Sequence, residues 1–186
     1  NTEQYLKTKL KVRSNSVCFI LSSISDEYIC ENNKTLARRI NIDLIKKLCD
    51  NNFSKLIFTS TTSLYSNCND PANEESEITD ANFYLYTKII GEDLIRKCNS
   101  NNIICRLSTV IGNSHNMRKD IFPNNIFNEN NPINVYGLRT YKPYFSIDDT
   151  VIGLINMLHY DDYKIINIGN NKMNLSKEII LKTANS

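Results

Sequence analysis

The order of short apolar runs is the feature that most constrains how this chain folds. Residues 17–21 and 56–58 are unbroken apolar runs, and residues 103–107 form a further predicted strand. Between the first two runs, apolar residues recur at helical spacing, namely Leu36, Ile40, Leu44, Ile45 and Leu48. A strand, helix, strand order with a crossover of this length places the strands parallel in one sheet. The sequence therefore predicts an α/β fold built on a parallel sheet.

Length and charge limit the function classes that are open to the chain. The 186 residues can bury one sizeable core and leave room for a second, small subdomain. The formal net charge is +2 and the pI is about 8.2, and no basic run is long enough to bind nucleic acid or an anionic membrane. No apolar run reaches the length of a membrane span, and no signal peptide opens the chain. We expect a cytoplasmic protein with small-molecule partners.

The cysteines and histidines do not form a metal-binding pattern. The six cysteines show no CxxC spacing, and His115 and His159 are the two histidines, so we expect no metal site. Cys18 and Cys105 lie within apolar runs, where a free thiol packs as a small hydrophobic side chain. This favours a reducing cytosol without structural disulfides.

A hydroxyl-rich strand end and a tyrosine–lysine pair carry the candidate chemistry. The apolar run at 56–58 continues into hydroxyl residues, Thr61 among them, as a buried strand does where it meets a crevice. Tyr84 and Lys88 follow on a predicted helix, and side chains four apart share one face. An ammonium beside a phenol favours the phenolate, so we expect Lys88 to lower the pKa of Tyr84 from about 10. Thr61 could hold the same substrate oxygen by a hydrogen bond.

The tyrosine–lysine spacing is open to a second interpretation as an ordinary contact on a helix surface. It occurs twice more in the chain, at Tyr5 and Lys9 and at Tyr160 and Lys164. The context of Tyr84 and Lys88 favours the catalytic interpretation. An acidic turn at residues 74–77 separates the strand from the helix, and Glu92 follows one turn after the lysine.

Residues 58–66 and 84–92, taken with this context, resemble the extended branch of the short-chain dehydrogenase/reductase superfamily. Members of that branch are NAD(P)-dependent nucleotide-sugar epimerases, dehydratases and reductases. The resemblance implies a parallel Rossmann-type sheet, incomplete at its N-terminal side, with NAD or NADP as cofactor and a nucleotide sugar as substrate. It divides the chain into a partial dinucleotide-binding domain at 1–112 and an interleaved, small α/β substrate-binding subdomain at 113–186.

The resemblance also assigns expected roles to single residues. Tyr84 and Lys88 would contact the cofactor as well as act in catalysis, and Thr61 would act in catalysis and contact the substrate. Ser22 and Ser23, in the small-residue turn after the first strand, resemble cofactor neighbours. An ordinary strand-ending turn would explain these two serines equally well.

Two segments in the second half of the chain resemble substrate-binding segments of the family. Residues 106–112 are similar to an Arg-Pro-x-Asn-Val-Tyr-Gly segment, in which Thr109 replaces the asparagine as the expected substrate contact. Residues 144–149 are similar to a Phe-x-His-Val-Asp-Asp segment. Six residues before its first aspartate, many relatives hold the nucleotide phosphates with an arginine, and Lys142 stands there with a charge but without the bidentate fork.

Asp148 is expected to cap the next helix. The apolar residues of that helix recur at helical spacing, at Val151, Leu154, Ile155 and Leu158. Residues 165–169 resemble a further strand of the family, ending in Asn-Ile-Gly. A buried apolar face on this helix is the expected consequence.

The glycine-rich loop of dinucleotide-binding folds does not occur in the sequence. In a G-x-x-G-x-x-G or G-x-G-x-x-G pattern, backbone N–H groups and a helix N-terminus hold the pyrophosphate. The chain has five glycines, and the first is Gly91. We expect either that the chain is part of a longer enzyme or that it is a naturally shortened relative that binds NAD weakly, and we favour the longer enzyme.

The residues after Thr61 favour one group of reactions within the resembling family. The 4,6-dehydratases typically carry Asp-Glu there, and Thr62 and Ser63 occupy the two positions here. Without an acid pair, hydride and proton transfer at one carbinol carbon fits best, so we expect an epimerase or reductase. From the resemblance we also expect a role in carbohydrate (surface polysaccharide) biosynthesis and a homo-oligomer. The alternative is a non-catalytic sugar-nucleotide binding or assembly module that has lost the cofactor-binding half.

Overall fold

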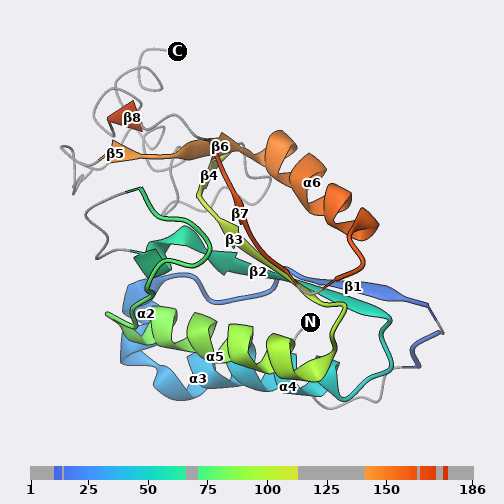
Figure 1. Cartoon of the computed structure of the whole chain (residues 1–186). Helices are drawn as coiled ribbons and strands as arrows, with labels where there is room; N and C mark the ends of the chain where they lie inside the picture. Colours follow the sequence, from blue (N-terminus) through green and yellow to red (C-terminus); the bar gives the residue numbers. More distant parts are fainter. Residues whose placement is uncertain are drawn as a thin grey trace. The chain divides into compact units, whose positions relative to one another are not determined.

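The computed structural model describes residues 11–13, 15–65, 71–112, 141–162, 164–170 and 174–175, and its main feature is a four-stranded parallel sheet in the order β1-β2-β3-β7 (Figure 1). The strands are β1 (Val17–Ile20), β2 (Lys55–Thr61), β3 (Ile103–Leu107) and β7 (Lys164–Ile168). In the first pair, Cys18 lies opposite Leu56 and Ile20 opposite Phe58. The prediction of an α/β fold with a parallel Rossmann-type sheet is confirmed.

Helices between the strands cover one face of this sheet (Figure 1). They are α2 (Glu27–Asn32), α3 (Lys34–Arg38), the π-helical η1 (Arg39–Asp43), α4 (Leu44–Cys49) and α5 (Phe83–Cys98). Residues 34–49 are helical, as the apolar spacing predicts. Helix α2 begins where Asp26 caps it by accepting a hydrogen bond from the Ile29 N–H.

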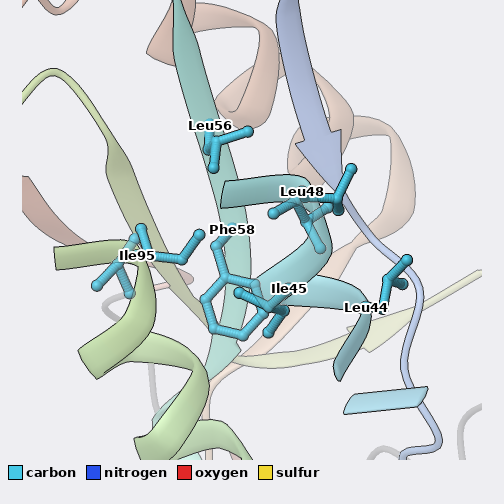
Figure 2. Packing of buried hydrophobic residues seen from close by; sticks show 8 residues of the cluster. Leu44, Ile45, Leu48, Leu56, Phe58 and Ile95 are labelled. Carbon is cyan, nitrogen blue, oxygen red and sulfur yellow. The ribbon is translucent and has the colours of Figure 1, made fainter. Parts of the chain in front are cut away.

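The main hydrophobic core lies between the sheet and helices α4 and α5. Its members are Ile20, Leu44, Ile45, Leu48, Leu56, Phe58, Ile95 and Ile104. Figure 2 shows the Phe58 ring between the side chains of Ile45 and Ile95. A Cβ atom on Gly91 would lie 2.8 Å from the Phe58 ring and 2.9 Å from Ile45, so the absent side chain at this position lets α5 approach the sheet closely.

The chain divides into two compact units, and the second contains small sheets of its own. The first unit comprises Asn1–Arg106 and Leu154–Asn167, and the second Leu107–Gly153 and Ile168–Ser186. In the second, β4 (Thr109–Ile111) pairs parallel with β6 (Tyr144–Ser146), and β5 (Tyr141–Lys142) pairs antiparallel with β8 (Asn174–Leu175). The division into domains at 1–112 and 113–186 stays a prediction, and most of 113–186 lies outside the described residues.

Helix α6 (Ile147–Asn156) corrects two expectations. Ser146, not Asp148, caps it, because the Ser146 hydroxyl accepts from the Asp149 N–H at 3.0 Å and donates to the Asp149 carboxylate at 2.7 Å. Of the apolar residues expected on one buried face, Leu154 is buried. The other three are 39 to 49% exposed, namely Val151, Ile155 and Leu158. The apolar spacing identified the helix but not the side that packs.

Two further features concern the described part of the chain only. None of its helices is long and apolar enough to cross a membrane. Within the same residues, no group of three or more His, Cys, Asp or Glu side chains gathers in a way that could hold a metal ion.

Strand β1 forms an edge of the sheet, and we expect the chain to associate through it. Val17 is 37% exposed and Leu21, just past the strand, is 58% exposed. Within the part of the chain that the structure describes, no strand pairs with the outer side of β1, so apolar side chains accompany an open strand edge. Val17→Lys with Leu21→Lys should shift the purified chain from oligomers or aggregates toward monomer, measured by size-exclusion chromatography with light scattering. Tyr28→Lys, on the exposed side of α2, is the control. A wild-type chain that is monomeric at high concentration would contradict this prediction.

Candidate functional site

The candidate site begins at the carboxyl ends of β1 and β2. The two strands run parallel, and the Thr59 hydroxyl donates to the Ile20 carbonyl oxygen at 3.1 Å, so their ends stay together. Thr61 is the last residue of β2 and is half-buried. Ser22, which is exposed, and Ser23, which is half-buried, follow β1 at the same end of the sheet. Parallel strands place ligand sites at this end.

Helix α5 carries Tyr84 and Lys88 to the same place. The helix begins where the Asn82 side chain accepts a hydrogen bond from the Leu85 N–H at 2.9 Å. Lys88 is only 4% exposed, and its Nζ donates to the Thr59 carbonyl oxygen at 2.9 Å. The Thr61 side chain acts on the Tyr84 phenol there and lowers its pKa, against the larger effect of burial.

The aromatic rings around Lys88 complete this arrangement. Its Nζ lies 5.0 Å from the centre of the Phe58 ring and 5.8 Å from the centre of the Tyr84 ring. The structure thus brings together three residues that the sequence analysis selected, Thr61, Tyr84 and Lys88. Their catalytic roles stay a prediction.

The pKa values of the pair differ from the sequence-based expectation. Burial raises the pKa of Tyr84 to about 12, against the opposing effect of its hydrogen bond with Thr61. Burial lowers the pKa of Lys88 to about 8, while Glu92 and Cys30 act in the other direction. The expected lowering of the Tyr84 pKa is therefore not found in this chain, because desolvation of the phenol raises it.

Asn41 fixes the segment that follows β1. Its side-chain oxygen accepts from the Ile24 N–H at 2.8 Å, and its amide donates to the Ile24 carbonyl oxygen and to the Thr87 hydroxyl, both at 3.0 Å. The Thr87 hydroxyl in turn donates to the Tyr84 carbonyl oxygen at 2.7 Å. Asn41 therefore connects the segment after β1 with the helix that carries Tyr84.

A buried ion pair next to the site is a feature that the sequence analysis did not identify. Arg106 of β3 donates from Nε and Nη2 to the two carboxylate oxygens of Glu92 at 2.9 and 2.6 Å, and the Ser60 hydroxyl donates to the same carboxylate at 2.6 Å. We use the name α5 anchor for Lys88 with Thr59 and for Glu92 with Ser60 and Arg106. The four-residue spacing of Lys88 and Glu92 was the signal that could have revealed it.

The anchor continues toward β7 through Tyr65. Arg106 donates from Nη1 to the Tyr65 hydroxyl at 2.6 Å, and that hydroxyl donates to Asn167 at 2.9 Å. Burial by itself would lower the pKa of Arg106, but its hydrogen bonds with Glu92 and Tyr65 raise it above the ordinary value. The guanidinium therefore stays charged inside the protein.

The two remaining predicted site residues, Thr109 and Lys142, belong to the second unit. Thr109 begins β4 and is half-buried, and it lies opposite Tyr144 of β6. Lys142 is in β5, opposite Asn174. Their expected contacts with a nucleotide sugar remain predictions.

Comparison with known proteins identifies the family. Residues 20–169 match the NAD dependent epimerase/dehydratase family, which is most of the chain, and the chain therefore belongs to this family. The resemblance found in the sequence is thereby confirmed. A search of curated proteins finds no match.

Solved structures agree with this fold. MoeE5 in complex with UDP-glucose and NAD has 18% identity and a TM-score of 0.83, over 91% of this chain and 62% of that one. The UDP-glucuronic acid 4-epimerase from Bacillus cereus, in complex with UDP-glucuronic acid and NAD, has 22% identity and a TM-score of 0.79, over 91% and 59%. A dTDP-4-dehydrorhamnose reductase from Clostridium acetobutylicum has 16% identity and a TM-score of 0.79, over 90% and 60%. The chain spans about three fifths of these proteins.

The residues of the first unit fit a ribose of NAD, the cofactor of the family. The Lys88 ammonium has three N–H donors, and the described residues supply it with one hydrogen-bond acceptor, the Thr59 carbonyl oxygen, so donors remain for a ribose hydroxyl. Ser22 and Ser23 would lie beside the dinucleotide. The pyrophosphate is different, because the sequence contains no glycine-rich loop to hold it.

The lowered pKa of Lys88 predicts a specific dependence of stability on pH. Between its folded value of about 8 and its ordinary value of 10.5, the unfolded chain keeps a proton that the native chain has lost, so stability rises with pH. The free energy of unfolding of the wild type minus that of Lys88→Met should rise by about 3 kcal/mol over this range. Urea unfolding followed by circular dichroism from pH 7 to 11 measures it.

Lys97→Met is the matched control for this experiment. Lys97 lies on the same helix but is exposed, so its stability difference should stay constant over the same pH range. A constant difference for Lys88→Met as well would show that Lys88 is not buried as the structure has it.

Proposed function

We propose that this chain carries the catalytic residues of an NAD-dependent nucleotide-sugar epimerase or reductase. The observation that carries the proposal is the meeting of Thr61, Tyr84 and Lys88 at the carboxyl end of β2, with Lys88 fixed on the Thr59 carbonyl oxygen. Membership of the epimerase/dehydratase family supports the same chemistry.

In this proposal Tyr84 moves the proton of the reaction. A phenol with a pKa of about 12 stays protonated at neutral pH, so it is ready to donate to a carbonyl oxygen that is becoming an alkoxide. Thr61 already acts on the Tyr84 phenol by lowering its pKa, and its hydroxyl would bind the same substrate oxygen. NAD, when bound, supplies the hydride donor and acceptor.

Lys88 supports Tyr84 through its charge and position. Its buried Nζ lies over the Tyr84 ring, and a positive charge there favours the phenolate when Tyr84 has to accept a proton. The pKa of about 8 keeps the amine mostly charged at neutral pH. The remaining N–H donors would hold a ribose hydroxyl of the cofactor.

The residues after Thr61 favour epimerisation or reduction over dehydration. Thr62 and Ser63 lie in η2 (Thr62–Tyr65), and the Ser63 N–H donates to the Thr61 hydroxyl at 3.2 Å. Neither side chain is an acid or base that could assist elimination at neutral pH. Hydride transfer at one carbinol carbon needs Tyr84 alone as proton carrier.

The wider assignment follows the family. We propose a nucleotide sugar as substrate, with Thr109 as a contact to it and Lys142 as a charge for its phosphates. Ser22 and Ser23 are proposed cofactor neighbours. A cytoplasmic homo-oligomer in carbohydrate biosynthesis, such as that of a surface polysaccharide, fits this chemistry.

A second candidate function is a non-catalytic module that binds or assembles with sugar nucleotides. The sequence without a glycine-rich loop supports it, as do the exchanges at Thr109 and Lys142. In that case Tyr84 and Lys88 would persist as relics. The two candidates differ in whether the native protein turns over a nucleotide sugar.

Tyr84→Phe tests the catalytic candidate directly. In the native full-length protein this change should lower turnover about 10²- to 10⁴-fold, because it removes the proton carrier, while binding of the sugar nucleotide stays nearly intact. Steady-state kinetics and calorimetric titration of the nucleotide sugar measure the two quantities. Tyr86→Phe is the control, since Tyr86 lies on the same helix and stacks on Phe83. Retention of most activity by Tyr84→Phe would remove Tyr84 from the mechanism.

NADH binding to the chain by itself should be weaker than micromolar. Lys88 can hold a ribose hydroxyl, but no glycine-rich loop is present for the pyrophosphate. Titration of NADH into the purified chain, followed by calorimetry or fluorescence, measures the dissociation constant. A micromolar value would reveal a cofactor site that these residues do not account for.

A further inference from the structure

We propose that Glu92 is a positioning residue of the candidate site, held by Arg106 and Ser60 so that its carboxylate keeps the Lys88 side chain charged beside Tyr84. The inference rests on the proposed function of Lys88 and Tyr84 and adds a residue that acts through Lys88. It depends on the geometry of the α5 anchor.

Two consecutive residues of β2 bind side chains from two consecutive turns of helix α5. Lys88 donates to Thr59 at 2.9 Å, and one turn later Glu92 accepts from Ser60 at 2.6 Å. Side chains four apart on a helix have their Cβ atoms roughly 5 to 6 Å from one another, so Lys88 and Glu92 leave α5 from the same face, the one that meets β2. Both residues are 4% exposed, so little water screens their interaction.

Charged and titratable groups from several elements face Lys88. Helix α5 contributes Glu92 and Tyr84, and α2 contributes the thiol of Cys30. Among the described residues, β2 adds the Phe58 ring and the Thr59 carbonyl group, and Arg106 of β3 is paired with Glu92. Burial favours the neutral amine, and both Glu92 and Cys30 oppose it. The pKa of the Cys30 thiol is itself raised by burial, so the thiol stays protonated and Glu92 is the carboxylate that acts on Lys88.

Stability of the fold does not by itself explain the buried ion pair of Arg106 and Glu92. Well-packed apolar residues of similar volume often replace a buried ion pair at no cost in stability. Arg106 instead binds both carboxylate oxygens with its planar fork and fixes their direction. A carboxylate that is held in a fixed direction can stabilise the charge of a further group, and Lys88 is the buried cation one helical turn away.

The test is the protonation of Lys88 in the chain without substrate or cofactor. Protein labelled with [ε-¹³C]lysine is titrated by NMR, and the Lys88 signal is assigned with Lys88→Arg. In Glu92→Gln, which keeps the shape of the side chain, the titration midpoint of Lys88 should fall by about 1 to 2 pH units. An unchanged midpoint in a folded variant overturns the proposal.

Asp93→Asn is the matched control. It removes the same charge at the next position of α5, where Asp93 is paired with Arg96 and 40% exposed, and the Lys88 midpoint should not move. An equal fall in Asp93→Asn would show a general charge effect and would also overturn the proposal.

A double variant keeps the test decisive if Glu92→Gln leaves Arg106 unpaired and unfolds. Glu92→Gln with Arg106→Met removes the buried pair as a whole, and the Lys88 midpoint should still fall. An unchanged midpoint in the double variant counts against the proposal. Because no turnover is measured, failure here is distinct from failure of the proposed function, which Tyr84→Phe decides.

Discussion

The α5 anchor is the interaction on which the rest of the candidate site depends. Taking a charged side chain out of water costs several kcal/mol, and the anchor buries Lys88, Glu92 and Arg106 together. Mutual attraction and hydrogen bonds to Thr59 and Ser60 offset this cost only while the geometry holds. The helix that carries Tyr84 is therefore fixed along β2 in a single register.

Packing makes the anchor possible. Gly91 lies between Lys88 and Glu92 in the sequence, and the lack of a side chain there lets α5 meet the Phe58 ring at van der Waals distance. Asn41 adds a second attachment by binding the segment after β1 to Thr87. Apolar contact sets how close the helix lies, and the polar groups then decide which residues face one another.

Burial in this chain favours the protonated form of Tyr84, the proposed proton carrier. Desolvation raises the pKa of Tyr84 to about 12 and lowers that of Lys88 to about 8. At neutral pH the phenol is therefore neutral, while the amine is charged but close to its titration range. This state suits proton donation.

The sequence by itself determined the α/β class, the parallel strands and the choice of Thr61, Tyr84 and Lys88, because apolar period and i, i+4 spacing are local properties. The family followed from the same short segments, as the match over residues 20–169 confirms.

Only the tertiary structure decided which groups are buried together. The apolar spacing of α6 could not say that Leu154 packs while Val151 and Ile155 remain exposed, since packing depends on neighbours far away in the chain. The pairing of Glu92 with Arg106 joins residues from a helix and a later strand. The direction of the Tyr84 pKa likewise depends on desolvation, a property of the folded surroundings that no sequence pattern contains.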